Sequence, residues 1–296
     1  MFQRILVVVD ALREVHPELG RAIQLAKAWG SELHIVDTVK DLNWFSRLFQ
    51  QQYVSVYEET VAHRKSKLEN LVHDCQSQGV PSTCRVLTGN SSERIIEAAQ
   101  QISADLIVRY AKGQHSLSKE KLGTTAQRLV RRLPTAIFLH RPQHEPIQSV
   151  VAAVDATPED QDHAALNCRI VQVANSLASQ NQANLKIVYA WTLYGEHLLR
   201  DHLPDSQYTS LVEHQRREHE DGFENLLTTL QLPADVGCVL DGDPSQAIPQ
   251  YCFDAHADLL VCGTIARSGI PGLLLGNTIE RIMQQVDCSI LALPKI

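Results

Sequence analysis

The segment DLLVCGTIARSGIPGLLLGNTIERIMQQVDCSILALP, residues 258–294, decides the fold of this 296-residue chain. It predicts a strand after Asp258, a glycine-rich loop, a helix that begins near Asn277, and a second strand over 289–293. A glycine-rich loop that leads from a strand into a helix exposes backbone N–H groups, and the helix dipole favours an anion there. The segment therefore predicts an α/β fold with a place for a phosphate group.

The same segment occurs a second time, 153 residues earlier in the chain (258 − 105 = 153). Asp105-Leu106-Ile107-Val108 matches Asp258-Leu259-Leu260-Val261, and no gap is needed between residues 86 and 139. Other pairs at this offset are Gly89 with Gly242, Ile95 with Ile248, Gly123 with Gly276, Thr125 with Thr278, and Arg128 with Arg281. A constant offset over this length indicates a tandem duplication.

Strand-like and helical segments alternate in both halves. Strands are expected at 4–9, 33–39, 83–87, 106–108 and 135–139, and again at 150–154, 185–191, 236–240, 259–262 and 289–293. The helix expected at 91–101 has Ser91 or Ser92 as its predicted N-cap. This alternation predicts βαβ units, parallel sheets, and helices on both faces of each sheet.

A polar stretch with two prolines, residues 141–147, separates the two halves and predicts a linker. We therefore expect two α/β domains, residues 1–141 and 148–296.

Composition excludes several classes of protein. The formal net charge is −7 and the sequence pI is about 6.0, which argues against general nucleic-acid binding, because such binding draws on a basic face. No apolar run approaches the roughly 20 residues of a membrane span. The N-terminus lacks the basic region and cleavage site of a signal peptide. We expect a cytoplasmic protein that does not bind a membrane.

Cysteine and histidine usage predicts neither disulfides nor a metal centre. The seven cysteines form no C-x-x-C pair, and most lie in apolar runs, so buried reduced thiols are expected. The thirteen histidines include two pairs spaced five apart, at 197 and 202 and at 214 and 219. Neither pair has the i, i+4 spacing that places two ligands on one helical face, and no cysteine lies nearby.

The duplicated halves resemble the universal stress protein family. An aspartate follows the first strand of each half, at Asp10 and Asp155, and Gly89 and Gly242 precede the third helices. Late loops at 110–124 and 263–277 complete the pattern. The resemblance covers the chain twice, as in tandem members of the family. It implies two Rossmann-like or flavodoxin-like domains, each with sheet order 3-2-1-4-5, and pairing of the two domains within one chain, which leaves monomer and homodimer both open.

Nucleotide-binding members of this family carry a signature: glycine, two residues, glycine, nine residues, then glycine followed by serine or threonine. The N-terminal half places Tyr110, Gly113, Gly123 and Thr124 at these positions, and the C-terminal half places Gly263, Ala266, Gly276 and Asn277 there. Each half therefore departs from the signature at different positions. Tyr110 either blocks the ribose position or stacks on a ligand.

The resemblance thus implies an adenine-nucleotide site, for ATP with Mg²⁺, chiefly in the C-terminal half. Its expected residues are Asp155, Val188, Gly263, Ala266, Gly276, Asn277 and Thr278. A weaker second site would comprise Asp10, Val36, Gly113, Gly123 and Thr124. For both aspartates, capping of the next turn is an alternative role, and core packing equally explains the two valines.

The expected function is a regulatory binding protein of the stress response without strong catalytic activity. A P-loop and a Gly-x-Ser-x-Gly motif are absent from the sequence. A weak ATPase or autophosphorylating switch in the C-terminal half is one alternative. A carrier of an apolar or lipid-like ligand is another, because residues 41–49 and 191–203 are rich in aromatic and aliphatic side chains and could cover such a ligand.

Overall fold

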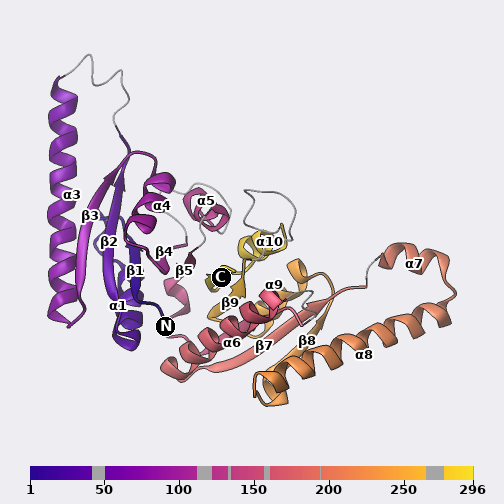
Figure 1. The fold of residues 1–296 in the computed structure, drawn as a ribbon. Coiled ribbons are helices and arrows are strands. Elements are labelled where there is room, and N and C mark those ends of the chain that lie inside the picture. Colours follow the sequence, from indigo (N-terminus) through magenta and orange to yellow (C-terminus); the bar gives the residue numbers. More distant parts are fainter. Residues whose placement is uncertain are drawn as a thin grey trace. The chain divides into compact units, whose positions relative to one another are not determined.

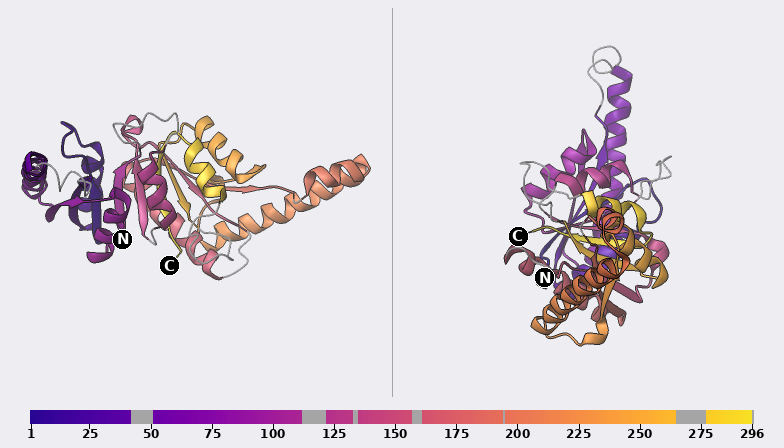
Figure 2. Two further views of the ribbon diagram at one scale, coloured as in Figure 1. Left: turned by 90° about the horizontal axis from the view of Figure 1, so that it is seen from above. Right: turned by 90° about the vertical axis from the view of Figure 1, so that its right-hand side faces the viewer.

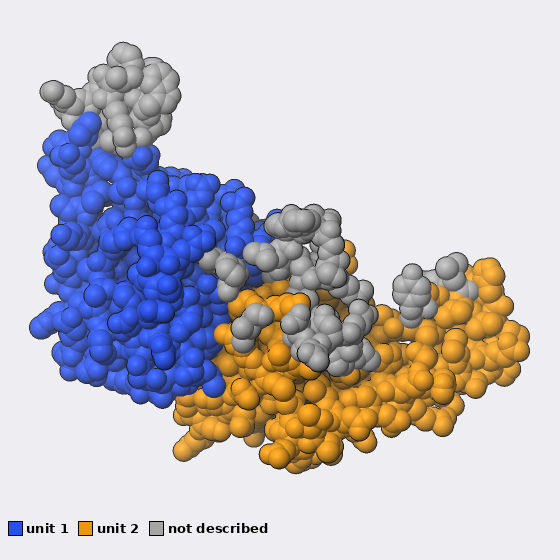
Figure 3. Space-filling view, viewed as in Figure 1, with its two compact units in different colours: residues 1–143, 271–274 blue, residues 144–270, 275–296 orange. Residues whose placement is uncertain are grey.

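The computed structural model of the chain describes residues 1–41, 51–111, 122–132, 135–156, 161–193, 195–264 and 277–295. These residues form two compact units, unit 1 within residues 1–143 and unit 2 within residues 144–295 (Figure 3). We describe each unit by itself.

Unit 1 is a five-stranded parallel sheet in the order β3-β2-β1-β4-β5 (Figure 1). Helices α1 and α3 pack on one face, and α4 and α5 cover the other. The elements are β1 (Arg4–Val8), α1 (Pro17–Trp29), β2 (Glu32–Val39), α3 (Gln51–Ser77), β3 (Ser82–Thr88), α4 (Ser91–Gln101), β4 (Leu106–Tyr110), α5 (Thr124–Arg132), β5 (Ala136–His140) and the short η1 (Pro142–His144).

Unit 2 repeats this architecture, with sheet order β8-β7-β6-β9-β10 and all strands parallel. Its elements are β6 (Ser149–Ala153), α6 (Gln161–Asn181), β7 (Asn184–Trp191), α7 (Glu196–His202), α8 (Asp205–Thr229), η2 (Ala234–Val236), β8 (Gly237–Asp241), α9 (Pro244–Asp254), β9 (Leu259–Gly263), α10 (Asn277–Gln285) and β10 (Ser289–Leu293). Both units have the order 3-2-1-4-5, so the predicted fold class is confirmed. Helix α7 was not predicted from the sequence.

The central strands form the core of each unit because nearly all of their side chains are buried. Few side chains of the long helices α3 and α8 are buried against the sheets. In α3 the described buried side chains are Leu68 and Cys75, and in α8 they are Phe223 and Leu227. The N-terminal half of α8, with α7 beyond it, extends past the strands of unit 2 (Figure 2).

The loops that follow β3 and β8 use the same backbone conformation. Gly89 and Gly242 have φ of 127° and 115°, a region that glycine enters without steric cost. The prediction that Ser91 or Ser92 caps α4 was wrong. Asn90 is the N-cap, and its side chain accepts hydrogen bonds from the backbone N–H groups of the first turn, as Asp243 does for α9. The offset of 153 thus relates the two caps as well.

Replacing Asn90 by alanine is expected to destabilise unit 1 by about 1 kcal/mol, because two backbone N–H groups at the start of α4 lose their acceptor. Urea denaturation of the wild type and the variant measures this. Asn90→Asp is the control and should be near neutral, since it retains the acceptor. A loss as large in the control as in the alanine variant would contradict the capping role.

All seven cysteines are free thiols in the structure, four of them buried. Across the described residues, no helix is both long enough and apolar enough to span a membrane.

Candidate functional site

The carboxyl ends of the first and fourth strands meet at the same edge of each sheet, and ligands of such folds bind at this switch point. In unit 1 Val8 pairs with Val36 on one side and with Arg109 on the other. In unit 2 Ala153 pairs with Val188 and with Cys262. The predicted aspartates therefore follow strands that end at the switch points.

In unit 1 a salt-bridge network occupies this edge. Nη1 of Arg64, on α3, lies 2.5 Å from Oδ2 of Asp37 and 3.3 Å from Oδ1 of Asp10. Asp37 also accepts hydrogen bonds from the backbone N–H groups of Ala11 and Thr38. The side chains of Asp37 and Arg64 are 3% and 16% exposed. The guanidinium of Arg64 therefore lies against the carboxylate of Asp10, which the family resemblance implied as a nucleotide-binding residue.

Burial affects the ionisation of Asp37 in this network. Burial raises the pKa of the Asp37 carboxyl above its ordinary value, and the hydrogen bond and charge of Arg64 oppose that rise. Oδ1 of Asp10 also accepts a hydrogen bond from the backbone of Leu12, so the turn-capping role considered for this aspartate is present. Asp10 is therefore engaged by the protein itself.

Tyr110 ends β4 and is covered by a cation. The guanidinium carbon of Arg13 lies 4.7 Å from the centre of the Tyr110 ring, within the range of a cation–π interaction. Arg109 donates through Nε to the carbonyl oxygen of Tyr110. Burial lowers the pKa of Arg109 to about 10, with Glu18 opposing and Arg13 assisting this shift, so Arg109 is charged at neutral pH. Two arginines thus cover the end of this strand.

The remaining predicted residues of unit 1 lie in three places. Val36 is 3% exposed and packs beneath α4. Gly123 is buried, donates its N–H to the carbonyl of Ala111, and precedes the exposed Thr124 at the start of α5. Gly113 lies outside the described residues.

In unit 2 the aspartate is held differently. The backbone N–H and C=O of Asp155 both bond to the side chain of Asn167, which is 3% exposed, and the Asp155 residue is exposed. Val188 is fully buried. The structure therefore fixes the backbone of Asp155 through α6 at the end of β6.

An aromatic cluster joins α8 to β7. The Tyr189 hydroxyl lies 2.7 Å from Nδ1 of His219, and the His219 ring stacks on Trp191 with 4.7 Å between ring centres. Burial lowers the pKa of His219, so its imidazole is neutral at neutral pH. Trp191 is 6% exposed and belongs to the core of unit 2. Of the other proposed aromatic segment, residues 41–49, all but Asp41 lie outside the described residues.

Gly263 ends β9, and a side chain at this position would meet helix α6. A Cβ atom there would lie 2.5 Å from Cδ2 of Leu166 and 3.4 Å from Cδ1 of Ile170, both on α6. The next residue, Thr264, continues the pairing with β10 through the carbonyl of Leu293. The end of β9 therefore carries no side chain, whereas the matching end of β4 carries Tyr110.

Helix α10 carries two further residues of the site predicted for unit 2. The helix begins at Asn277, and Thr278 in its first turn is exposed. Ala266 and Gly276 lie outside the described residues. Val188 of β7 and Gly263 of β9 thus lie on the two strands that flank β6, and Asp155 follows β6. Among the described residues, no group of three His, Cys, Asp or Glu side chains could hold a metal ion.

Sequence analysis missed the side chains that define the edge of unit 1, namely Arg13, Asp37, Arg64 and Arg109. Arg109 gave a signal, because an arginine directly follows the apolar run 106–108. The strand register relates Asp37 to Tyr189, because each follows the valine that pairs with the end of the first strand. Their partners on the long helices are Arg64 and His219. The two halves thus use different polar pairs, Asp37–Arg64 and Tyr189–His219, at one position of the fold.

Two parallel domains of order 3-2-1-4-5, each with an aspartate after its first strand, define a class of tandem α/β proteins. The sequence profile of the universal stress protein family matches residues 1–140 and again residues 146–294. The chain belongs to the universal stress protein family.

Curated relatives support the tandem assignment. Universal stress protein E of Photorhabdus laumondii is 24% identical over 298 residues, which cover 99% of this chain and 95% of the relative. Universal stress protein E of Escherichia coli K12 is also 24% identical, with 99% and 94% covered. A universal stress protein structure from Pseudomonas aeruginosa UCBPP-PA14 superposes with a TM-score of 0.76 at 21% identity, covering 99% of this chain and 93% of that one. The resemblance predicted from the sequence is confirmed.

Proposed function

We propose that this protein is a regulatory binding protein of the stress response, and that it binds an adenine nucleotide through unit 2. The observation that carries this proposal is the contrast between the two strand ends at the switch points. β9 ends in Gly263, without a side chain, whereas β4 ends in Tyr110 beneath the guanidinium of Arg13. A ribose or phosphate can approach a bare strand end more closely than one covered by a ring and a cation.

The helix that follows each loop supports the same assignment. α10 begins at Asn277, and backbone N–H groups in the first turn of a helix favour a phosphate. In unit 1, by contrast, Arg64 already binds Asp10, so a ribose hydroxyl would have to displace an arginine. The residues proposed for the nucleotide are Asp155, Val188, Gly263, Ala266, Gly276, Asn277 and Thr278.

The described polar groups near β7 support binding rather than catalysis. A general base must reach the proton that it removes. His219 is stacked on Trp191, and its Nδ1 lies within hydrogen-bonding distance of the Tyr189 hydroxyl. The ring is thus held by core contacts, and we propose no catalytic role for it.

Calorimetric titration of Mg·ATP into the whole chain tests this function. We expect micromolar binding by wild type, and a loss of at least about tenfold in Gly276→Trp, because an indole beside the start of α10 would exclude phosphate. Asn277→Ala should weaken binding by a smaller factor. The matched control is Thr124→Ala, at the equivalent position of unit 1, which should bind as wild type does.

Two outcomes would contradict the proposal. Absence of heat with wild type would show that the loops do not bind ATP. Weaker binding in Thr124→Ala, with Gly276→Trp unchanged, would assign the nucleotide to unit 1 instead. Phosphate release measured on the same samples should stay at the level of a protein-free blank.

A further inference from the structure

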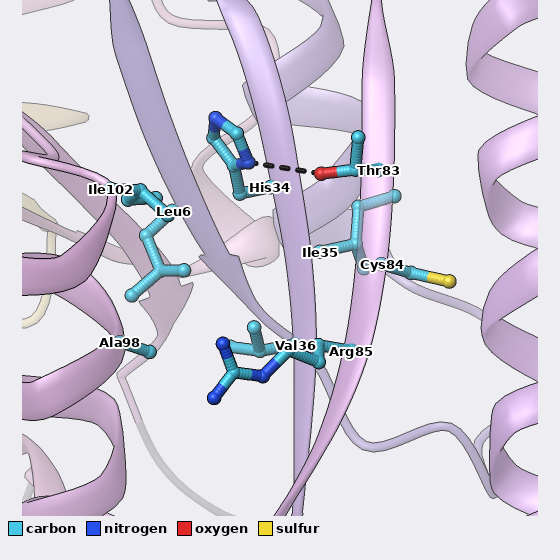
Figure 4. Close-up of a pocket in the computed structure, with 9 residues that line it drawn as sticks. All are labelled: Leu6, His34, Ile35, Val36, Thr83, Cys84, Arg85, Ala98 and Ile102. Carbon is cyan, nitrogen blue, oxygen red and sulfur yellow. Dashed lines mark hydrogen bonds between the residues drawn. The ribbon is translucent and has the colours of Figure 1, made fainter.

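A cavity of about 110 Å³ lies in unit 1 between α4 and the sheet (Figure 4). Residues of three neighbouring strands, of α4 and of its C-cap line it: Leu6, His34, Ile35, Val36, Thr83, Cys84, Arg85, Ala98 and Ile102. Its apolar wall comprises Leu6, Val36, Ala98 and Ile102. The cavity is thus distinct from the proposed nucleotide site, which belongs to unit 2.

One cation lies beside this apolar wall. In Figure 4 the guanidinium of Arg85 lies next to Val36, while the sulfur of Cys84 points to the opposite side of β3. Among the hydrogen bonds of the described residues, Arg85 donates through Nη1, to Gln101 at 3.0 Å. Its Nε and Nη2 form the planar fork that suits a carboxylate. Arg85 is exposed, so this fork stands at the mouth of the cavity.

His34, which also lines the cavity, does not offer a free polar group to a carboxylate ligand. Its Nδ1 lies 2.9 Å from the Thr83 hydroxyl, and its Nε2 lies 3.2 Å from a carboxylate oxygen of Glu32. Both ring nitrogens therefore have partners within the protein. The ring closes one side of the cavity, and the charge available to a ligand is that of Arg85.

Unit 2 carries different residues at the positions equivalent to Arg85 and Ala98. Val36 pairs with Arg85 in unit 1, and Val188 pairs with Cys238 in unit 2, so Arg85 and Cys238 are equivalent. By the offset of 153, Ala98 corresponds to Tyr251 on α9. Tyr251 is partly buried, and its pKa is raised by burial and by the nearby Cys238. A phenol ring in one unit thus replaces a methyl group in the other, and a cysteine replaces the arginine.

We propose that this cavity binds a short-chain aliphatic monocarboxylate, with the carboxylate on Arg85 and the chain against the apolar wall. Size supports this ligand class, since a cavity of about 150 Å³ holds benzene, and this one is somewhat smaller. A ligand of about six heavy atoms, with its carboxylate at the mouth, matches the volume. Phosphate would satisfy Arg85 but would leave the apolar wall without contacts.

Butyrate is the probe, and saturation-transfer NMR on the whole chain is the measurement. Butyrate should give a saturable signal from its methyl group. 1-Butanol and butylamine, which match its length but lack the anion, should bind at least about tenfold more weakly, because they lose a charge-assisted bidentate contact. Equal binding of butanol and butyrate would refute the role of Arg85.

Three variants test where butyrate binds. Ala98→Tyr places the residue of unit 2 in the cavity and should abolish binding. Arg85→Gln changes an exposed side chain, leaves the fold intact, and should weaken butyrate about tenfold while leaving butanol unchanged. Tyr251→Ala/Cys238→Arg rebuilds the arrangement in unit 2 and should create a second site. Butyrate binding that persists in both Ala98→Tyr and Arg85→Gln would place the ligand elsewhere and overturn the proposal.

Discussion

Arg64→Leu is expected to destabilise unit 1 by about 3 kcal/mol at neutral pH. The substitution leaves Asp37, which is 3% exposed, without its counter-ion, and removing one partner of a buried ion pair strands the other charge in a poorly solvated place. Hydrogen exchange followed by mass spectrometry measures the effect, because peptides from β1 and β2 report on unit 1 while those from β6 and β7 serve as an internal reference.

A matched arginine on the other long helix provides the control. Arg216 of α8 forms a salt bridge with Asp241, and both side chains are about half exposed. Arg216→Leu should change the stability of unit 2 by less than about 1 kcal/mol, since water screens an exposed pair. Equal effects of the two substitutions would mean that burial of the Asp37–Arg64 pair has no energetic consequence, contrary to our argument.

The effect of Arg64→Leu should depend on pH with a definite sign. Burial raises the pKa of Asp37, so its ionised form is disfavoured in the folded state, and Arg64 reduces this penalty. Without Arg64 the pKa rises further and the penalty at neutral pH grows. As the pH falls through the raised pKa, Asp37 takes up a proton in both proteins. The difference in stability should therefore be smaller at about pH 4 than at about pH 7.

The double variant Arg64→Leu/Asp37→Asn separates charge from hydrogen bonding. Asn removes the buried charge but retains only one of the two acceptors that serve the N–H groups of Ala11 and Thr38. We therefore expect partial recovery relative to Arg64→Leu, and little remaining dependence on pH in this range. A double variant less stable than the single one would show that the uncompensated charge is not the cause of the loss.

The fold was predictable from the sequence because its signals are local and repeated. Apolar runs such as 106–108 and 259–262, and the constant offset between the halves, need no knowledge of tertiary contacts. The side chains at the strand ends were not predictable in the same way. Asp37 and Arg64 are 27 residues apart, and their meeting depends on how a mostly polar helix packs on the sheet, which periodicity alone does not determine.

The packing role of Gly263 was likewise not predictable from the sequence. From the family signature it is a residue that allows a ligand to approach the backbone. The structure adds a second constraint, because Leu166 of α6 occupies the space where its side chain would project. At the matching position Tyr110 is accommodated in unit 1. The requirement for glycine therefore arises from the packing of one particular helix, and a single sequence does not show it.

Gly263→Ala is expected to destabilise unit 2 by about 1–3 kcal/mol, because the new methyl group would lie 2.5 Å from Cδ2 of Leu166 in a packed core. Leu166→Ala alone should also be destabilising, since Leu166 is 5% exposed and its removal leaves a cavity. Combined, the two changes should cost less than their sum by about 1 kcal/mol or more, because the methyl group then fills space that Leu166 vacated. If the losses in stability of the two single variants simply added up, the proposed clash between the new methyl group and Leu166 would be refuted.

Mg·ATP titration of the same three variants then separates packing from ligand approach. If packing is the main requirement for glycine at position 263, the double variant should regain ATP affinity together with the favourable coupling in stability. The physical reason is that its methyl group points toward α6, into the space that Leu166 has vacated. If stability is recovered while ATP binding stays weak, the backbone of Gly263 itself must lie against the nucleotide, and our assignment of the glycine to packing would be wrong.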